Sequence, residues 1–137
     1  ILDSMFDEMG GDWSKTIQEF ARVRVQDGDA IAELAQRNFV EMRDLVADPK
    51  FLLRKKIAAD LHTKFPQEFV PVYSMVTFGN TPYHLALEED EAQNALFREI
   101  LSLENVEKEW NGGAVEQAFR AWLAGKFRDL VNPRNAL

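Results

Sequence analysis

The chain has 137 residues, of which 46% are hydrophobic and 28% charged, which is the size and balance of a single folded domain. Since it has no cysteine, disulfides, iron–sulfur clusters and thiol nucleophiles are excluded. Its 16 basic and 23 acidic side chains give a net charge of −7, which argues against a protein that binds nucleic acid through its phosphates.

Neither a membrane span nor a signal peptide is recognisable in the sequence. No run of about 18 apolar residues, the length that a membrane-spanning helix needs, is present. The first residue is Ile1 and not Met, and no signal-peptide pattern follows it. We therefore expect residues 1–137 to form a single helical domain, cut from a longer protein of the cytoplasm.

The first part of the chain predicts a short opening segment and one helix. The segment from Ile1 to Met9 ends at Gly10-Gly11. Asp12 is a suitable N-cap for a helix from Trp13 to about Val23, in which apolar residues recur at helical spacing. Asp27-Gly28-Asp29 then predicts a turn.

Two further helices are separated by a proline. Apolar periodicity predicts a helix from Ala30 to about Ala47. This helix is expected to end at Asp48-Pro49, because the residue before a proline avoids helical geometry. Pro49 is favourable in the first turn of the next helix, which Pro66 is expected to end.

Residues 69–81 differ from the rest, because they are rich in β-branched and aromatic residues and contain Pro71. They fit either a short strand or an irregular loop. Pro82 then begins a helix to about Leu103, and a last amphipathic helix from Ala114 to Val131 is expected to end before Pro133. The sequence thus predicts an all-α fold of about six helices, with one short non-helical or strand-like insertion near residues 69–81.

Common enzyme signatures are missing from the sequence. It holds no GxGxxG, Walker, HExxH or GxSxG motif. His62 and His84 stand apart with no carboxylate at metal-ligand spacing, so we expect two surface or half-buried histidines and no metal site. The basic run 54–56 and the acidic run 88–91 are expected to be solvated helix faces.

The predicted helix 30–47 carries polar side chains on its apolar face. Asn38 lies near the middle of a stripe that includes Met42, and Glu41 lies at its edge. A buried amide without a hydrogen-bond partner costs about 1–3 kcal/mol. Asn38 therefore either pairs with a backbone group in the core or lines a pocket. In such a pocket Asn38 and Glu41 would face a polar ligand, and Met42 would make an apolar contact.

Tyr73 presents a similar choice. A tyrosine in the string VPVYSMVTF is commonly a core or edge residue whose hydroxyl reaches a backbone group. The same hydroxyl could equally face a ligand. The residues alone leave both interpretations open.

Three strings of residues resemble the kynurenine 3-monooxygenase family. They are NFVEMRD at 38–44, DPKFLLRKK at 48–56 and FVPVYSMVTF at 69–78, with Pro82-Tyr83 after the last. The separations between the strings agree as well, and so does the upstream string DAI at 29–31. The resemblance covers residues 1 to about 90.

The resemblance implies an oxidative function. Members of the family are flavoproteins that bind FAD, reduce it with NADPH and use oxygen to hydroxylate L-kynurenine at ring position 3. Their Rossmann-like FAD-binding domain comes first in the chain, and its glycine-rich fingerprint is missing here. This chain therefore resembles the C-terminal helical part of such an enzyme.

The same resemblance implies roles for four residues. Asn38 is similar to a family asparagine that holds the substrate carboxylate, and Tyr73 to a tyrosine that reaches the amino-acid end of the substrate. Glu41 resembles an active-site glutamate, and Met42 a methionine that packs near substrate and flavin. No catalytic, cofactor-binding or metal-binding residue is implied in this chain.

The implied partners are the N-terminal FAD-binding part of the same enzyme and L-kynurenine. FAD and NADPH would belong to the full-length parent, so we expect the chain alone to bind neither and to be inactive. The face of helix 30–47 should be exposed or covered by a second copy. The alternative is a non-enzymatic helical module that buries Asn38 and Tyr73 and binds a protein partner.

Overall fold

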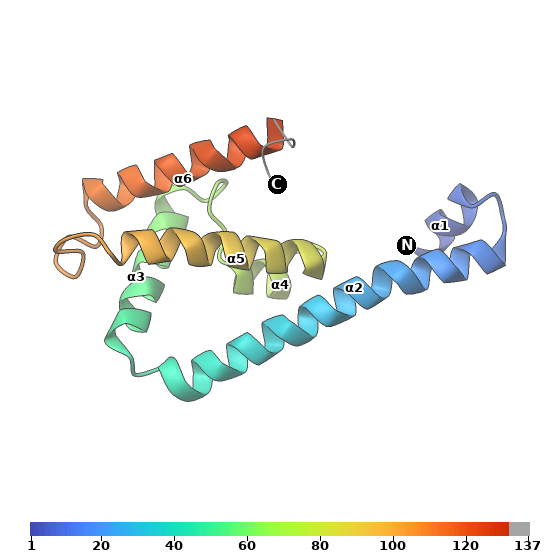
Figure 1. Cartoon of the computed structure of the whole chain (residues 1–137), viewed down its shortest axis with the longest axis horizontal. Helices are drawn as coiled ribbons and strands as arrows, with labels where there is room; N and C mark the ends of the chain where they lie inside the picture. Colours follow the sequence, from blue (N-terminus) through green and yellow to red (C-terminus); the bar gives the residue numbers. More distant parts are fainter. Residues whose placement is uncertain (132–137) are drawn as a thin grey trace.

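The structure is a computed structural model, and it describes residues 1–131. Over these residues the fold is all-α, as predicted, with six α-helices, one short π-helix and no strand. The helices α5 and α6 lie side by side, and α2 crosses below them as a long rod (Figure 1). The elements are α1 (Leu2–Glu8), α2 (Trp13–Val40), the π-helix η1 (Glu41–Leu45), α3 (Pro49–Lys64), α4 (Val72–Phe78), α5 (Tyr83–Ile100) and α6 (Gly113–Val131).

The predicted helix starts after Asp12 and at Pro49 are confirmed. The Asp12 carboxylate accepts hydrogen bonds from the backbone N–H groups of Ser14 and Lys15, and so caps α2. The Asp48 carboxylate caps α3 in the same way, with Pro49 in the first helical turn. Both caps are local interactions, and the sequence predicted the one at Asp12.

The predicted turn at Asp27-Gly28-Asp29 is wrong, because α2 runs without a break from Trp13 to Val40. The two helices expected on either side of the turn are therefore one. Asp27 and Ala30 are both buried, at 8% and 3% exposure. The burial of Ala30 and the hydrogen bonds of Asp27 to His84 of α5 outweigh the cost of a glycine inside a helix, which is about 1 kcal/mol.

The insertion near residues 69–81 is only partly non-helical. Val72–Phe78 forms the two-turn helix α4, and Pro71 precedes it as the N-cap residue. β-Branched residues have only a modest helix penalty, and packing of α4 against α5 overcomes it. The strand-like alternative is thus excluded for residues 72–78.

The main core joins α3, α5 and α6. Its largest fully buried side chains include three phenylalanines, Phe69, Phe97 and Phe119. The ring of Phe69 meets the other two edge-on, at centroid distances of 6.1 and 6.0 Å. Such edge-to-face contacts add to the hydrophobic gain of burial. This core holds α3 and α5 in place, and the pocket described below lies between them and α2.

Helix α6 docks on the core through Val115, Ala118 and Phe119, as its amphipathic pattern predicts. Phe127 of the same helix is 59% exposed. Pro133, the predicted end of this helix, lies outside the described residues. Among residues 1–131 we find no helix with the length and apolar character required to cross a membrane.

Candidate functional site

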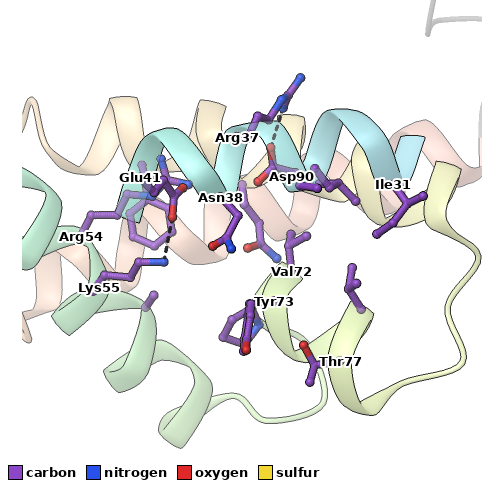
Figure 2. Close-up of a pocket in the computed structure, with 17 residues that line it drawn as sticks. Ile31, Arg37, Asn38, Glu41, Arg54, Lys55, Val72, Tyr73, Thr77 and Asp90 are labelled. Atoms are coloured by element: carbon purple, nitrogen blue, oxygen red, sulfur yellow. Dashed lines mark hydrogen bonds and ion pairs between the residues drawn. The ribbon is translucent and has the colours of Figure 1, made fainter. Parts of the chain in front are cut away.

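A pocket of about 290 Å³ lies between α2, α3, α4 and α5. Figure 2 shows its lining side chains, with α2 above the opening and α4 below it. The lining combines apolar side chains with five charged ones. The lining comprises Ile31, Leu34, Ala35, Arg37, Asn38, Glu41, Arg54, Lys55, Ala58, Pro71, Val72, Tyr73, Val76, Thr77, Asp90, Gln93 and Phe97.

Three of the four residues predicted to bind substrate line this one pocket. They are Asn38 and Glu41 from α2 and its π-helical extension, and Tyr73 from α4. Asn38 points down from α2 toward α4, on which Tyr73 lies (Figure 2). The residue strings that carry the family resemblance, far apart in sequence, are thus adjacent in the fold.

Asn38 and Tyr73 are accessible rather than buried. Tyr73 is 63% exposed, and Asn38 also belongs to the exposed residues. The interpretation of Asn38 as a core amide paired with a backbone group is therefore wrong. Both side chains present polar atoms at the pocket surface, where a hydroxyl and an amide can each donate and accept hydrogen bonds.

Met42 is the predicted site residue that the structure sets apart. Its side chain is 66% exposed and does not line the pocket. Met42 lies in η1, where the helix widens into a π-turn before Asp48-Pro49. A contact of Met42 with substrate stays a prediction.

Glu41 begins the π-turn and is paired across the pocket with α3. Its Oε2 atom lies 3.2 Å from Nζ of Lys55, and a dashed line marks this pair in Figure 2. Single π-turns are frequent at functional sites, because they redirect side chains within an otherwise regular helix. Here the turn follows directly after the pocket-facing residues of α2.

Arg37 and Asp90 join α2 to α5 at the rim of the pocket. Nη1 of Arg37 donates to Oδ2 of Asp90 at 2.5 Å, and the guanidinium also pairs with Glu33 and, at 3.4 Å, with Glu91. The carboxylates of Glu33, foremost, and Asp90 raise the pKa of Arg37 above its already high value. Arg37 is therefore permanently charged, and its ion pairs join α2 to α5.

Arg54 is a pocket residue that sequence reasoning missed. The run 54–56 was predicted to be a solvated face, yet Arg54 is half-buried and lines the pocket. Its Nη2 donates to Oδ1 of Asn94 at 2.5 Å, and its guanidinium lies 4.8 Å from the centre of the Phe97 ring. Burial lowers the pKa of Arg54, and the charges of Glu41 and Asp90 oppose this shift.

The acidic run 88–91 is likewise not wholly a solvated face. The side chains of Glu89 and Asp90 are only 13% and 18% exposed. Glu89 pairs with Lys126 of α6 and accepts a hydrogen bond from the buried amide of Gln93. Three of the four carboxylates thus pair with other helices, because Glu91 also reaches Arg37 of α2, and of the four Glu88 and Glu91 are exposed as predicted.

The two histidines are half-buried and bonded to other groups, in agreement with the prediction. Nδ1 of His62 lies 2.7 Å from the carbonyl oxygen of Phe69, and Nδ1 of His84 lies 2.7 Å from Oδ1 of Asp27. Within residues 1–131, no group of three or more potential ligands could hold a metal ion. These histidines therefore serve as contacts between segments.

Curated relatives of this chain are kynurenine 3-monooxygenases. Those of Flavobacterium johnsoniae and Flavobacterium psychrophilum are 44% and 42% identical over 116 residues, which is 85% of this chain and 26% of each relative. The protein of Sus scrofa is 38% identical over 87 residues, 64% of this chain and 18% of the relative. No protein-family model matches the chain.

These matches confirm the family resemblance and extend it. A match of 116 residues cannot end before residue 116, so homology continues past residue 90, where the sequence alone offered no match. The chain spans about a quarter of the length of the curated relatives it matches.

Proposed function

Because this chain is homologous to the kynurenine 3-monooxygenases over most of its length, we propose that it forms one wall of the substrate pocket in such an enzyme. The enzyme would hydroxylate L-kynurenine to 3-hydroxykynurenine with FAD, NADPH and oxygen. One observation carries the proposal: Asn38, Glu41 and Tyr73, which the resemblance associates with substrate, line a single pocket. The chain would supply the C-terminal helical part.

The chemistry of the lining suits kynurenine. The substrate combines an aromatic ring with a carboxylate, an amine and an aniline, so it needs an apolar surface beside several donors and acceptors. Val72, Val76 and Phe97 offer the apolar surface. The Asn38 amide and the Tyr73 hydroxyl offer both donors and acceptors, and would hold the amino-acid end of the substrate.

The residues of this pocket do not fit FAD. No glycine is among the lining residues, whereas a dinucleotide pyrophosphate needs a glycine-rich turn at a helix N-terminus. In the proposal the flavin and NADPH sites belong to an N-terminal part of the enzyme. The pocket residues of this chain bind and orient the substrate and exclude water around its apolar body.

A non-enzymatic role in protein binding is the second candidate function. Phe39, Met42 and Val46 are 59%, 66% and 53% exposed, and exposed apolar side chains of this kind favour a partner surface. In the enzyme the same three side chains would contact the N-terminal part. Self-association of the chain and a cytoplasmic location remain predictions.

The test is spectroscopic and uses the full-length protein that contains this chain. We expect the purified protein to show flavin absorbance and to oxidise NADPH faster when L-kynurenine is added, with tryptophan as the control amino acid. The product 3-hydroxykynurenine should appear by chromatography. A colourless protein, or a yellow one that responds to neither amino acid, would overturn the proposal.

A further inference from the structure

Gln93 is a buried polar residue of the pocket, and the protein holds its amide group in one orientation. It lies in α5, lines the pocket and is only 4% exposed. Its Nε2 atom donates to the carbonyl oxygen of Val70 at 2.8 Å and to Oε1 of Glu89 at 3.1 Å. An amide nitrogen carries two hydrogens, so both are used. Because both partners are acceptors, the other terminal atom of the Gln93 amide is its oxygen.

Two segments of the chain orient this amide. Glu89, one helical turn before Gln93, also pairs with Lys126 of α6. The Glu89 side chain is only 13% exposed, so its carboxylate is held between α5 and α6. Val70 lies in the segment that precedes α4. The position of the Gln93 amide therefore depends on α6 and on the segment before α4, as well as on α5 itself.

The Oε1 atom of Gln93 is open to the pocket. In the part of the chain that the structure describes, the hydrogen bonds of the Gln93 side chain are the two made by Nε2. Residues 1–131 hold no side-chain nitrogen or oxygen that is both buried and unpaired. Oε1 is therefore accessible, and the hollow that Gln93 lines is this pocket. A carbonyl oxygen accepts hydrogen bonds and cannot donate them, so its partner in the pocket must be a donor.

The surroundings of Gln93 favour an uncharged donor on an aromatic ring. Phe97, one turn further along α5, also lines the pocket. The guanidinium of Arg54 lies over the Phe97 ring, with its central carbon 4.8 Å from the ring centre. A second positive charge beside this guanidinium would be repelled. A neutral amine avoids the repulsion, and the ring that carries it can lie against Val72 and Val76.

We infer that Gln93 is a specificity-determining residue whose Oε1 atom accepts a hydrogen bond from a neutral, ring-bound amine of the ligand. The inference rests on the proposed function and deepens it. The ligand class is a small aromatic amine, and in L-kynurenine the donor is the aniline nitrogen. In the proposed function Asn38 and Tyr73 hold the amino-acid end of the substrate. Gln93 holds the opposite, aromatic end.

The experiment compares two ligands in the full-length protein that contains this chain. L-Kynurenine has the ring amine, and benzoylalanine is the same molecule with hydrogen in its place. By titration calorimetry we expect the unaltered protein to bind kynurenine about 3- to 10-fold more tightly, the range of a neutral hydrogen bond. Gln93→Met has a side chain of similar length whose sulfur is only a weak acceptor. In this variant the preference for kynurenine should disappear.

Two further variants make the result specific. Gln93→Lys can still donate to Val70 and Glu89 but has no acceptor, so it should lose the preference while it keeps the contacts that anchor the side chain. Trp122→Phe removes the hydrogen bond to the carbonyl oxygen of Ala92, the neighbour of Gln93 in α5, and lies outside the pocket. It should keep the full preference. The ratio of the two affinities does not depend on how much of each variant is folded.

The outcomes separate the inference from the proposed function. A protein that binds kynurenine and keeps its preference in both Gln93 variants overturns the role of Gln93 and leaves the proposed function intact. Equal binding of the two ligands by the unaltered protein does the same. An unaltered protein that binds neither ligand overturns both. A loss of preference in Trp122→Phe equal to that in Gln93→Met would show a general disturbance of α5, and would also overturn the role of Gln93.

Discussion

Asp27 in the middle of α2 accepts two hydrogen bonds from His84 at the start of α5. The backbone N–H and the ring Nδ1–H of His84 both reach Oδ1 of Asp27, at 3.3 and 2.7 Å. These bonds, that of the ring foremost, hold the pKa of Asp27 below its usual value. The contact spans 57 positions in sequence and secures α2 where a turn had been predicted.

This contact predicts loss of stability in acid. A carboxyl group whose pKa is lower in the folded state stabilises that state above its unfolded pKa, near 4. The stabilisation disappears as the pH falls from about 4 through the folded pKa. Asp27→Asn should therefore be less stable than the unaltered chain at pH 7, and the difference should shrink at pH 3. Urea titrations at both pH values measure this.

Asp29→Asn is the matched control for Asp27. Asp29 lies on the same helix but is exposed, and it makes no ion pair with another described residue. Its replacement should leave the free energy of unfolding nearly unchanged at both pH values. Equal effects of the two substitutions would contradict the assigned role of the contact between Asp27 and His84.

Gly28→Ala should stabilise the chain. Gly28 lies inside α2, and a Cβ atom added there would meet no atom within 4 Å. Alanine is favoured over glycine in a helix interior by about 0.5–1 kcal/mol. The melting temperature should rise accordingly. Gly79→Ala should lower it, because a Cβ at Gly79 would come within 2.6 Å of the carbonyl oxygen of Met75.

Trp122→Ala should destabilise the docking of α6. The indole packs against the core beside Phe119, and its Nε1–H donates to the carbonyl oxygen of Ala92 at 3.2 Å. Since Trp122 is only partly buried, we expect the lower end of the usual cost, about 3 kcal/mol. Thermal melts measure it. Phe127→Ala, at an exposed site of the same helix, should have little effect.

Asn38→Ala and Tyr73→Phe should weaken substrate binding in the complete enzyme. Each removes one hydrogen-bonding group from the pocket surface, and bonds to a charged ligand group are worth about 1.5–3 kcal/mol. Affinity for kynurenine should fall by about one to two orders of magnitude, with FAD still bound. Because both residues are exposed, the melting temperature should stay the same. A lowered melting temperature with unchanged affinity would contradict the assignment.

Local chemistry accounts for the features that the sequence predicts well. The cap at Asp12, the start at Pro49 and the helical periodicity all depend on residues a few positions apart. Long-range contacts decide the rest. The continuity of α2 depends on His84, and the helical form of α4 depends on packing against α5, neither of which has a local signal.

The pocket residues likewise divide into those that the sequence could identify and one that it could not. Asn38, Glu41 and Tyr73 were identified because their strings resemble known relatives, and the apolar face of α2 placed two of them together. Arg54 could not be identified, because the partners that hold it, Asn94 and Phe97, are 40 and 43 positions away. In a run of three basic residues, nothing local distinguishes the one that turns inward.

Helix α2 is fastened to α5 at two points, through Asp27 and through Arg37. Ten residues separate them, a distance of about 15 Å along a helix, and the pocket-lining residues Ile31 and Leu34 lie between. Beyond Asp27, the rest of α2 extends with α1 away from the other helices (Figure 1). Helix α2 is thus held to α5 at both ends of its pocket-lining stretch, and its N-terminal part extends beyond the contact at Asp27. A movement of the N-terminal part of α2 would therefore strain the contact at Asp27 first. The stretch between Asp27 and Arg37 keeps its position over the pocket as long as both contacts remain.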